Sequence, residues 1–406
     1  MKDRLILHSD CNCFYASVEM LKHPEYRDKP MAVGGDAESR HGIILTANYA
    51  AKAYGIKTGM TLVQAKQICP AIVILKPDME LYREYSGMVR EIYYDYTDRQ
   101  QSFGIDECWL DISSPNTTQE DAIVIAKEIN RRVREELGIT VSVGVSFNKV
   151  FAKLASDYKK PDAITTMFRD EYRDKAWPLP VSDLLYVGKS TCKKLNSVGI
   201  RTIGELAVTD KNIIQSILGK SGEMLWMFAN GYDDSPVETD DSPANVKSVG
   251  NSTTACRDLL NNEDARIVIY ALADSVAARL REKGLRCRVI EVSIRDCNLV
   301  TITRQRKLSG VTDITSEIAK EAYELFLESY DWAKPVRSIG VRAGDLVDNT
   351  YSEQMELFCD YSYKEKLKKA DLVIDEIRKK FGNASIRRGV AFKDKNLSYI
   401  RPDKKK

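Results

Sequence analysis

The stretches Asp10-Cys-Asn-Cys-Phe-Tyr-Ala-Ser-Val-Glu19 and Gly104-Ile-Asp-Glu-Cys-Trp-Leu-Asp111 decide the fold. A short apolar run, residues 4–9, comes directly before Asp10 and is typical of a buried strand that carries a carboxylate at its end. Residues 101–105 and 108–112 predict the two strands of a hairpin, with the adjacent pair Asp106 and Glu107 at its turn. The two stretches therefore place three acids where strands end.

The three acids, Asp10, Asp106 and Glu107, form the strongest chemical pattern in the chain. Two unit charges ~4 Å apart repel by about 4 kcal/mol at an effective dielectric of ~20, so carboxylates clustered on an apolar framework favour a bound cation. Oxygen ligands of this kind suit Mg²⁺, and a pair of such ions supports phosphoryl transfer by in-line displacement. For any single acid the alternative is structural, with Asp10 capping the next helix and the other two solvated in a turn.

The composition fits a globular chain of several domains. At 406 residues the chain exceeds one ordinary core, and 43% of its residues are hydrophobic and 30% charged. No apolar run approaches the ~20 residues that span a bilayer, and the start is too polar for a signal peptide, so we expect a cytoplasmic protein without a membrane partner. Nine irregularly spaced cysteines fit reduced thiols, three histidines argue against a zinc site, and the net charge of +2 decides nothing about nucleic acid.

Outward from the two stretches, hydrophobic periodicity predicts a mixed α/β domain with a small insert between Pro30 and Pro77. We expect strands over 31–33, 43–45 and 140–146 and helices over 14–21, 49–54, 62–68, 81–96 and 121–137.

The second half of the chain changes character twice. Residues 182–230 predict short helices broken by glycines at 188, 199 and 204, and the acidic, proline-containing stretch 231–243 predicts an exposed connector. A second α/β sandwich should follow, with helices over 264–283 and 313–329 and strands over 288–295, 299–305 and 336–343. Residues 363–381 predict a charged helix of unknown role, and the basic end 401–406 predicts disorder.

The two opening stretches resemble the signature segments of the Y-family (translesion) DNA polymerases. The resemblance continues through Thr46-Ala-Asn-Tyr-Ala-Ala-Lys-Ala-Tyr-Gly-Ile-Lys-Thr-Gly59 and Val143-Gly-Val-Ser-Phe-Asn-Lys-Val-Phe-Ala-Lys-Leu-Ala-Ser-Asp-Tyr-Lys-Lys-Pro161, and it covers residues 5–345 in the family's order. It implies an α+β multidomain fold, a right-hand polymerase. The implied parts are a palm (1–19 and 78–166), small fingers (20–77), a helical thumb (167–232), a linker (233–244), an α/β little finger (245–345) and a C-terminal tail (346–406).

The resemblance also implies roles for single residues. It makes Asp10, Asp106 and Glu107, with the backbone carbonyl of Cys11, the catalytic ligands of two Mg²⁺ ions, for which Mn²⁺ is an alternative. Tyr15 becomes the steric gate that excludes a 2′-hydroxyl, although a core aromatic on a helix is the alternative. The remaining nucleotide-binding residues that it implies are Phe14, Thr46, Tyr49, Lys52 and Lys160. Where many relatives carry Arg at position 52, this chain has Lys, which lacks the bidentate fork for phosphate.

Two regions predict DNA contacts. Residues 185–206 resemble a helix-hairpin-helix, in which Gly188 lets the backbone approach a phosphate and Lys189 and Lys193 lie near it, although an ordinary helical hairpin is the alternative. The strands at 286–295 and 301–307 alternate, and we expect Arg295, Arg304 and Arg306 on an outer face that follows a DNA backbone; a solvated sheet face is the alternative.

Gln354-Met-Glu-Leu-Phe358 resembles the peptide by which bacterial polymerases dock on the sliding clamp, with Gln354, Leu357 and Phe358 as anchors; an amphipathic helix start is the alternative. The implied protein is a monomeric, template-directed DNA polymerase that acts on primer–template DNA and dNTPs, with low fidelity and tolerance of lesions. Within the family it is like DNA polymerase IV or like the polymerase V catalytic subunit, which needs accessory proteins. Outside the family, the alternatives are a nucleotidyl cyclase and a non-catalytic DNA-binding scaffold.

Overall fold

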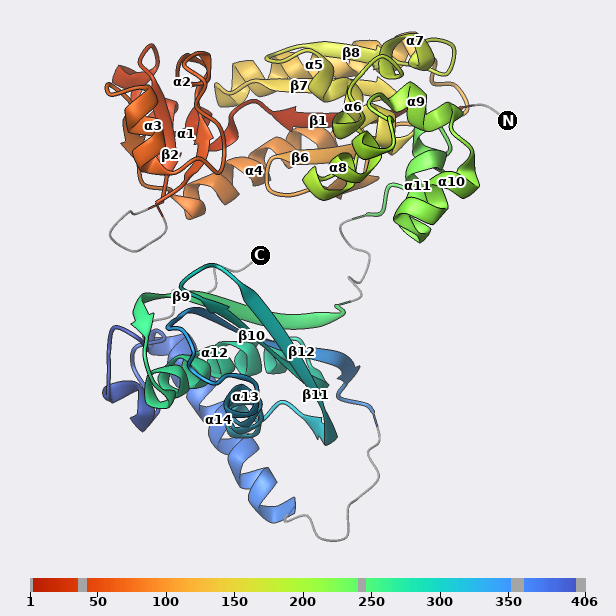
Figure 1. The fold of residues 1–406 in the computed structure, drawn as a ribbon. Helices are drawn as coiled ribbons and strands as arrows, with labels where there is room; N and C mark the ends of the chain where they lie inside the picture. Colours follow the sequence, from red (N-terminus) through yellow and green to blue (C-terminus); the bar gives the residue numbers. More distant parts are fainter. Residues whose placement is uncertain (1–2, 36–41, 240–245, 352–360, 399–406) are drawn as a thin grey trace. The chain divides into compact units, whose positions relative to one another are not determined.

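The computed structural model describes residues 3–35, 42–239, 246–351 and 361–398, and it divides the chain into two compact units, Met1–Ser242 and Pro243–Lys406 (Figure 1). Each unit has its own sheet and its own hydrophobic core.

A five-stranded sheet forms the centre of the first unit, in the order β5-β6-β1-β7-β8. Its strands are β1 (Ile6–Cys11), β5 (Gln100–Ser102), β6 (Glu107–Asp111), β7 (Val141–Ser146) and β8 (Ile164–Met167). β1 lies antiparallel between β6 and β7 and is buried along its whole length. The expected hairpin is confirmed, since β5 and β6 pair antiparallel on either side of the acidic turn.

Helices cover both faces of this sheet. On one face, α1 (Phe14–Lys22), α4 (Met79–Tyr94) and α5 (Gln119–Leu137) share a core with Leu7 and Val143. On the other face, α6 (Lys149–Tyr158) places Ala152 against Ile6 and Trp109. Alternate residues of a strand point to opposite faces, so Ile6, His8 and Asp10 all face the side of α6. The predicted helices of this part are confirmed, whereas α6 and β8 were not predicted.

A smaller sheet, β3-β2-β4, forms the insert after α1. It contains β2 (Met31–Gly34), β3 (Ile44–Ala47) and β4 (Val73–Leu75), with η1 (Pro24–Tyr26), α2 (Tyr49–Ala53) and α3 (Leu62–Ile68) around it. The Asn48 side chain accepts hydrogen bonds from the amides of Met31 and Ala51, which joins the start of α2 to the sheet.

Short helices complete the first unit: α7 (Tyr172–Ala176), η2 (Val181–Asp183), α8 (Lys189–Ser197), α9 (Ile203–Val208), α10 (Lys211–Leu218) and α11 (Lys220–Ala229). Gly188 and Gly199 lie at helix ends as expected. The expectation for Gly204 was wrong, because this glycine lies inside α9. Its place is explained by packing, since an added Cβ would lie 3.0 Å from the Trp177 Cβ.

The connector after α11 is anchored to the sheet, which corrects the expectation that residues 231–243 are exposed. The Arg4 guanidinium donates to the Asp233 carbonyl at 2.8 Å, and the Lys149 amide donates to the Asp233 carboxylate at 3.2 Å. Val237 is only 6% exposed and packs in a cluster with Trp109. Acidic and proline residues are typical of exposed linkers, but one buried valine and these hydrogen bonds hold the described part of this connector on the unit.

The second unit is a four-stranded antiparallel sheet, β11-β10-β12-β9, whose one face is packed against two helices (Figure 1). Its elements are β9 (Ser248–Leu259), α12 (Asn262–Glu282), β10 (Leu285–Asp296), β11 (Thr301–Thr312), α13 (Thr315–Ser329), β12 (Val336–Asp348), α14 (Tyr361–Phe381) and η3 (Gly389–Phe392). The sandwich and the charged helix are confirmed, while β9 was not predicted as a strand. The clamp-like residues Gln354, Leu357 and Phe358 and the basic end 401–406 lie outside the described residues.

The register of β10 and β11 corrects the expected face of two arginines. Arg304 pairs with Val292 and Arg306 with Ile290, two buried residues that face the helices. Because paired residues share a face, Arg304 and Arg306 lie on the helix side. Arg306 forms ion pairs there with Glu321, Glu324 and Glu328 of α13. Of the three predicted arginines, Arg295 alone belongs to the open face, opposite Thr301.

Candidate active site

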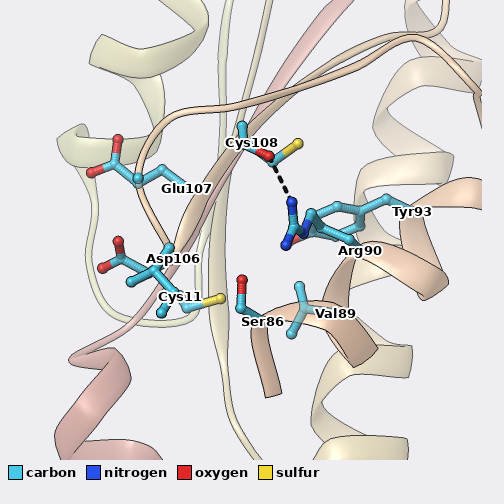
Figure 2. Close-up of a pocket in the computed structure, with 11 residues that line it drawn as sticks. Cys11, Ser86, Val89, Arg90, Tyr93, Asp106, Glu107 and Cys108 are labelled. Atoms are coloured by element: carbon cyan, nitrogen blue, oxygen red, sulfur yellow. Dashed lines mark hydrogen bonds between the residues drawn. The ribbon is translucent and has the colours of Figure 1, made fainter. Parts of the chain in front are cut away.

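The three acids meet at one end of the five-stranded sheet. Asp10 and Glu107 are direct partners across β1 and β6, and the Cys11 amide donates to the Asp106 carbonyl at 3.0 Å. Because paired residues share a face, the side chains of Asp10 and Glu107 lie on the same face. Figure 2 shows the carboxylates of Asp106 and Glu107 directed to one side, away from Arg90. The sequence prediction of a common acidic centre is consistent with this geometry.

A small pocket lies beside the acidic turn, between the hairpin and α4 (Figure 2). It is lined by Cys11, Ser86, Val89, Arg90, Tyr93, Ser102, Gly104, Ile105, Asp106, Glu107 and Cys108. Asp106 and Glu107 are both half-buried, so the turn is open to solvent while it rests on a packed framework.

The ammonium groups of two lysines form ion pairs with the acids. Lys160 lies 2.7 Å from Asp10 Oδ2, and Lys153 lies 2.5 Å from Glu107 Oε2. Asp157 of α6 contacts both lysines, at 3.6 Å from Lys153 and 2.8 Å from Lys160. Each carboxylate therefore has one oxygen that already interacts with a cation. Lys160 was expected near the nucleotide, whereas Lys153 was not recognised from the sequence.

The two paired acids differ in pKa. Burial raises the pKa of Asp10 to about 6, although the charge of Lys160 opposes the shift. Burial acts in the same direction on Glu107, but the nearby His8 imidazole and the charge of Lys153 outweigh it and lower the pKa of Glu107 to about 2. The pKa of Asp106 is raised by burial and by the nearby charge of Glu107. Opposite shifts within one acidic cluster are typical of functional sites.

His8 is a residue that sequence analysis missed. Its Nδ1 lies 2.8 Å from Ser156 Oγ, and that hydroxyl donates to the Lys153 carbonyl at 2.7 Å. A hydroxyl has one proton, so His8 Nδ1 is the donor to Ser156. His8 Nε2 then faces Glu107 Oε2 at 3.3 Å. The alternation of β1 carried the signal, because His8 lies two residues before Asp10 and so on the same face.

The residues that the sequence predicts to bind a nucleotide divide into two groups. Tyr49 reaches from α2 to the strand of acids, with its hydroxyl 3.4 Å from Asn12 Oδ1, and Lys52 lies over the Tyr49 ring at 4.9 Å. Thr46 is half-buried on β3, opposite Val33. Phe14, in contrast, is 2% exposed and packs in the core, so its ring is covered, and its role in nucleotide binding stays a prediction.

The first helix of the predicted helix-hairpin-helix begins at an open position. Gly188 is the N-cap of α8, no side chain of the described residues caps this end, and no atom lies within 4 Å of a Cβ added to Gly188. Lys189 opens the helix and Lys193 lies one turn later. Amides at such a helix start can donate to a phosphate.

The comparisons with known proteins agree with this arrangement. Residues 9–157 match the impB/mucB/samB family, residues 246–357 match its C-terminal domain, and residues 182–233 match the thumb domain of DNA polymerase-iota. DNA polymerase IV of Acetivibrio thermocellus is 52% identical over 98% of this chain and 100% of its own length. DNA polymerase IV 1 of Bacillus subtilis is 38% identical over 97% of this chain and 94% of its own length.

A solved Y-family DNA polymerase chimera, Dbh-Dpo4(243-245)-Dbh, superimposes with a TM-score of 0.74 at 25% identity, and the match covers 85% of this chain and 100% of the chimera. The chain belongs to the Y family of DNA polymerases. The three matched segments place the acids in the N-terminal Y-family region and α8 to α11 in the thumb-like region. In the described part of this Y-family chain, no helix is both long and apolar enough to cross a bilayer.

Y-family membership implies dependence on a divalent metal, and the donor set fits one. Hard carboxylate oxygens gather at one sheet end, and the ammonium groups of Lys153 and Lys160 already neutralise two of them. Within the described ranges, no three His, Cys, Asp or Glu side chains are gathered closely enough to hold a metal ion as they stand.

Proposed function

We propose that this chain extends the 3′ end of a primer with deoxynucleotides and uses Asp10, Asp106 and Glu107 as its catalytic acids. As a Y-family member with relatives named DNA polymerase IV, it is a DNA-directed DNA polymerase that acts in translesion synthesis. The observation that supports these three residues is their meeting at one sheet end, where two lysines neutralise the charge.

The same residues would hold the metal. Two Mg²⁺ ions, or Mn²⁺ in their place, would take the carboxylates of Asp10, Asp106 and Glu107 and the backbone carbonyl of Cys11. When bound, such ions stabilise the attacking and leaving oxygens of the transferred phosphoryl group. The protein supplies orientation, because Lys153 holds Oε2 of Glu107.

The incoming dNTP would lie beside the acids. Lys160, which contacts Asp10, is placed to turn from that carboxylate to the triphosphate, and Tyr49, Lys52 and Thr46 approach from the smaller sheet. Tyr15 would be the steric gate against a 2′-hydroxyl. Its pKa is raised by burial and by the charge of Asp106, and its position at the start of α1, four residues after Cys11, supports a ring on the side of the acids.

DNA would contact both units. Gly188, Lys189 and Lys193 offer a helix start and cations to the phosphate backbone, and Arg295 offers a cation on the open sheet face. We keep the sliding clamp as a partner through residues 354–358, and we expect a monomeric cytoplasmic enzyme of low fidelity. A catalytic subunit like that of polymerase V, dependent on accessory proteins, is the alternative, and the relatives do not favour it.

Primer extension tests this proposal. A labelled primer on a template is extended with each dNTP and with the matching rNTP, using the unchanged chain, Asp106→Ala and Tyr15→Ala. We expect dNTP addition that is lost by at least about 10³-fold in Asp106→Ala, because the metal site is removed, and rNTP use that appears in Tyr15→Ala. Intact duplex binding without addition by the unchanged chain, in Mg²⁺ or Mn²⁺, would instead favour the accessory-dependent subunit or the scaffold.

A further inference from the structure

The ring of Tyr15 is stacked on a second tyrosine that does not reach solvent. Tyr82 of α4 lies parallel to Tyr15, with ring centroids 4.4 Å apart and planes 13° apart, and Tyr82 is 0% exposed. Phe14 closes the cluster, 5.8 Å from Tyr15 and 6.4 Å from Tyr82. Such stacking fixes ring planes as well as burying area. The Tyr15 ring therefore has one face defined by Tyr82.

Tyr82 is itself held by the helix that carries Tyr15. Its hydroxyl donates to Glu19 Oε1 at 2.5 Å, and Glu19 is 3% exposed. Positions i and i+4 lie on the same side of a helix, so Tyr15 and Glu19 of α1 both contact Tyr82. A buried carboxylate needs its hydrogen-bond donor, so losing the hydrogen bond between Tyr82 and Glu19 is costly.

A gate against one oxygen atom depends on a ring that cannot retreat. Productive geometry in a binding site must be held to within ~0.5 Å, and packing and hydrogen bonds behind the contacting residue provide that restraint. Tyr15 is half-buried and its hydroxyl has no hydrogen bond among the described contacts, so stacking is its main restraint. Removing the Tyr82 ring would leave a cavity behind Tyr15 into which the gate could move.

We propose that Tyr82 is a positioning residue for sugar selection: it fixes the Tyr15 ring against the sugar and so sets the discrimination against ribonucleotides without contacting the nucleotide. This inference rests on the proposed gate role of Tyr15. The contact between α1 and α4 then contributes to substrate specificity as well as to the packing of the core.

The test compares kcat/KM for a correct dNTP and for the matching rNTP in Tyr15→Ala, Tyr82→Leu and Tyr82→Phe. We expect the dNTP preference to fall about tenfold in Tyr82→Leu, through a gain of rNTP use, because the gate gains room. Tyr82→Phe keeps the stacked ring and loses the hydroxyl, so its preference should stay near that of the unchanged chain while its thermal stability falls. Ile92→Ala removes another buried side chain of α4, one that does not line the pocket beside the acidic turn, and should leave the preference unchanged.

The outcomes separate the inference from the proposed function. If Tyr15→Ala admits ribonucleotides and Tyr82→Leu does not, the gate stands and the role of Tyr82 is overturned. Equal losses with dNTP and rNTP in Tyr82→Leu would reduce Tyr82 to a structural residue. If neither variant changes the preference, the gate role of Tyr15 itself is wrong. Should Tyr82→Leu fail to fold, Tyr82→Met, which fills the space without a flat ring, takes the same test.

Discussion

At the scale of single residues, the neighbouring side chains rather than the place in the sheet determine the pKa of each acid. Asp10 is buried and Glu107 is half-buried, and the two are paired in register, yet the pKa of Asp10 is raised to about 6 and that of Glu107 is lowered to about 2. Lys153 contacts Glu107 Oε2, and His8 Nε2 lies 3.3 Å from the same oxygen. The cluster thus keeps Glu107 firmly ionised, while Asp10 takes up a proton at a higher pH than an ordinary aspartate does.

A carboxyl of the second unit gives a prediction about pH. Arg257 donates to both oxygens of Asp264, at 2.7 and 2.9 Å, and this hydrogen bonding lowers the pKa of Asp264 against the effect of burial. A lowered carboxyl pKa stabilises the fold above the unfolded value of about 3.9, and the contribution is lost as the pH falls through the folded value.

We therefore expect Arg257→Gln to lower the free energy of unfolding of the second unit by about 1 kcal/mol at pH 7, the size typical of a partly exposed ion pair. The difference should shrink toward pH 3, because the contribution of the ionised Asp264 is lost as the pH falls through its lowered pKa. Urea unfolding of both chains at the two pH values measures this. A difference that stays the same at pH 3 would mean that Arg257 acts through packing.

At the scale of helices and strands, hydrophobic periodicity predicted the elements whose own sequence shows one buried face. The helix over 62–68 was predicted to the residue, and the strand before Asp10 to within two. The strands β4 and β8 have three and four residues and exist through parallel pairing with β2 and β7, which a local pattern does not contain.

The same limit applies to the site. The acids are close to strand ends and could be found from sequence. His8 and Lys153 reach Glu107, and Tyr82 reaches Tyr15, only through pairing and packing of distant segments. The error with Arg304 and Arg306 was avoidable. Strict alternation along β11 puts both arginines on the same face as the apolar Ile302.

The register of β10 and β11 supplies two arginine variants whose effects on DNA binding can be compared. Arg295 lies on the open face of the second sheet, whereas Arg306 is paired with carboxylates of α13. Arg295→Ala should weaken primer–template binding and reduce the slope of log affinity against log salt by about 1, because one phosphate contact is lost. Arg306→Ala should leave both unchanged. Fluorescence anisotropy across a salt series measures the two variants, and equal effects would contradict the assignment of faces.

At the scale of the whole chain, each unit has a segment outside its sheet that is held against the rest of that unit. In the first unit the described connector is held on the sheet by Arg4 and Val237. In the second unit α14 is joined to the sandwich by ion pairs, since Asp371 contacts Arg281 and Arg388 and accepts from the Thr315 amide at the start of α13. The helix of unknown role is therefore part of the fold of this unit.

Asp371 is the residue through which that attachment can be tested. Its side chain and that of Arg281 are each 5% exposed. Asp371→Ala leaves the Thr315 amide without its acceptor and removes one of the two carboxylates that pair with the Arg281 guanidinium, while Asp375 remains. Because Asp375 remains, we expect the second unit to lose less than the about 3–5 kcal/mol typical of a broken buried pair, together with faster hydrogen exchange and proteolysis across α14. Glu365→Ala is the control, because Glu365 is 67% exposed and pairs with Lys369 on the same helix. If α14 stays protected in Asp371→Ala, the apolar face of this helix holds it in place and the ion pairs are secondary.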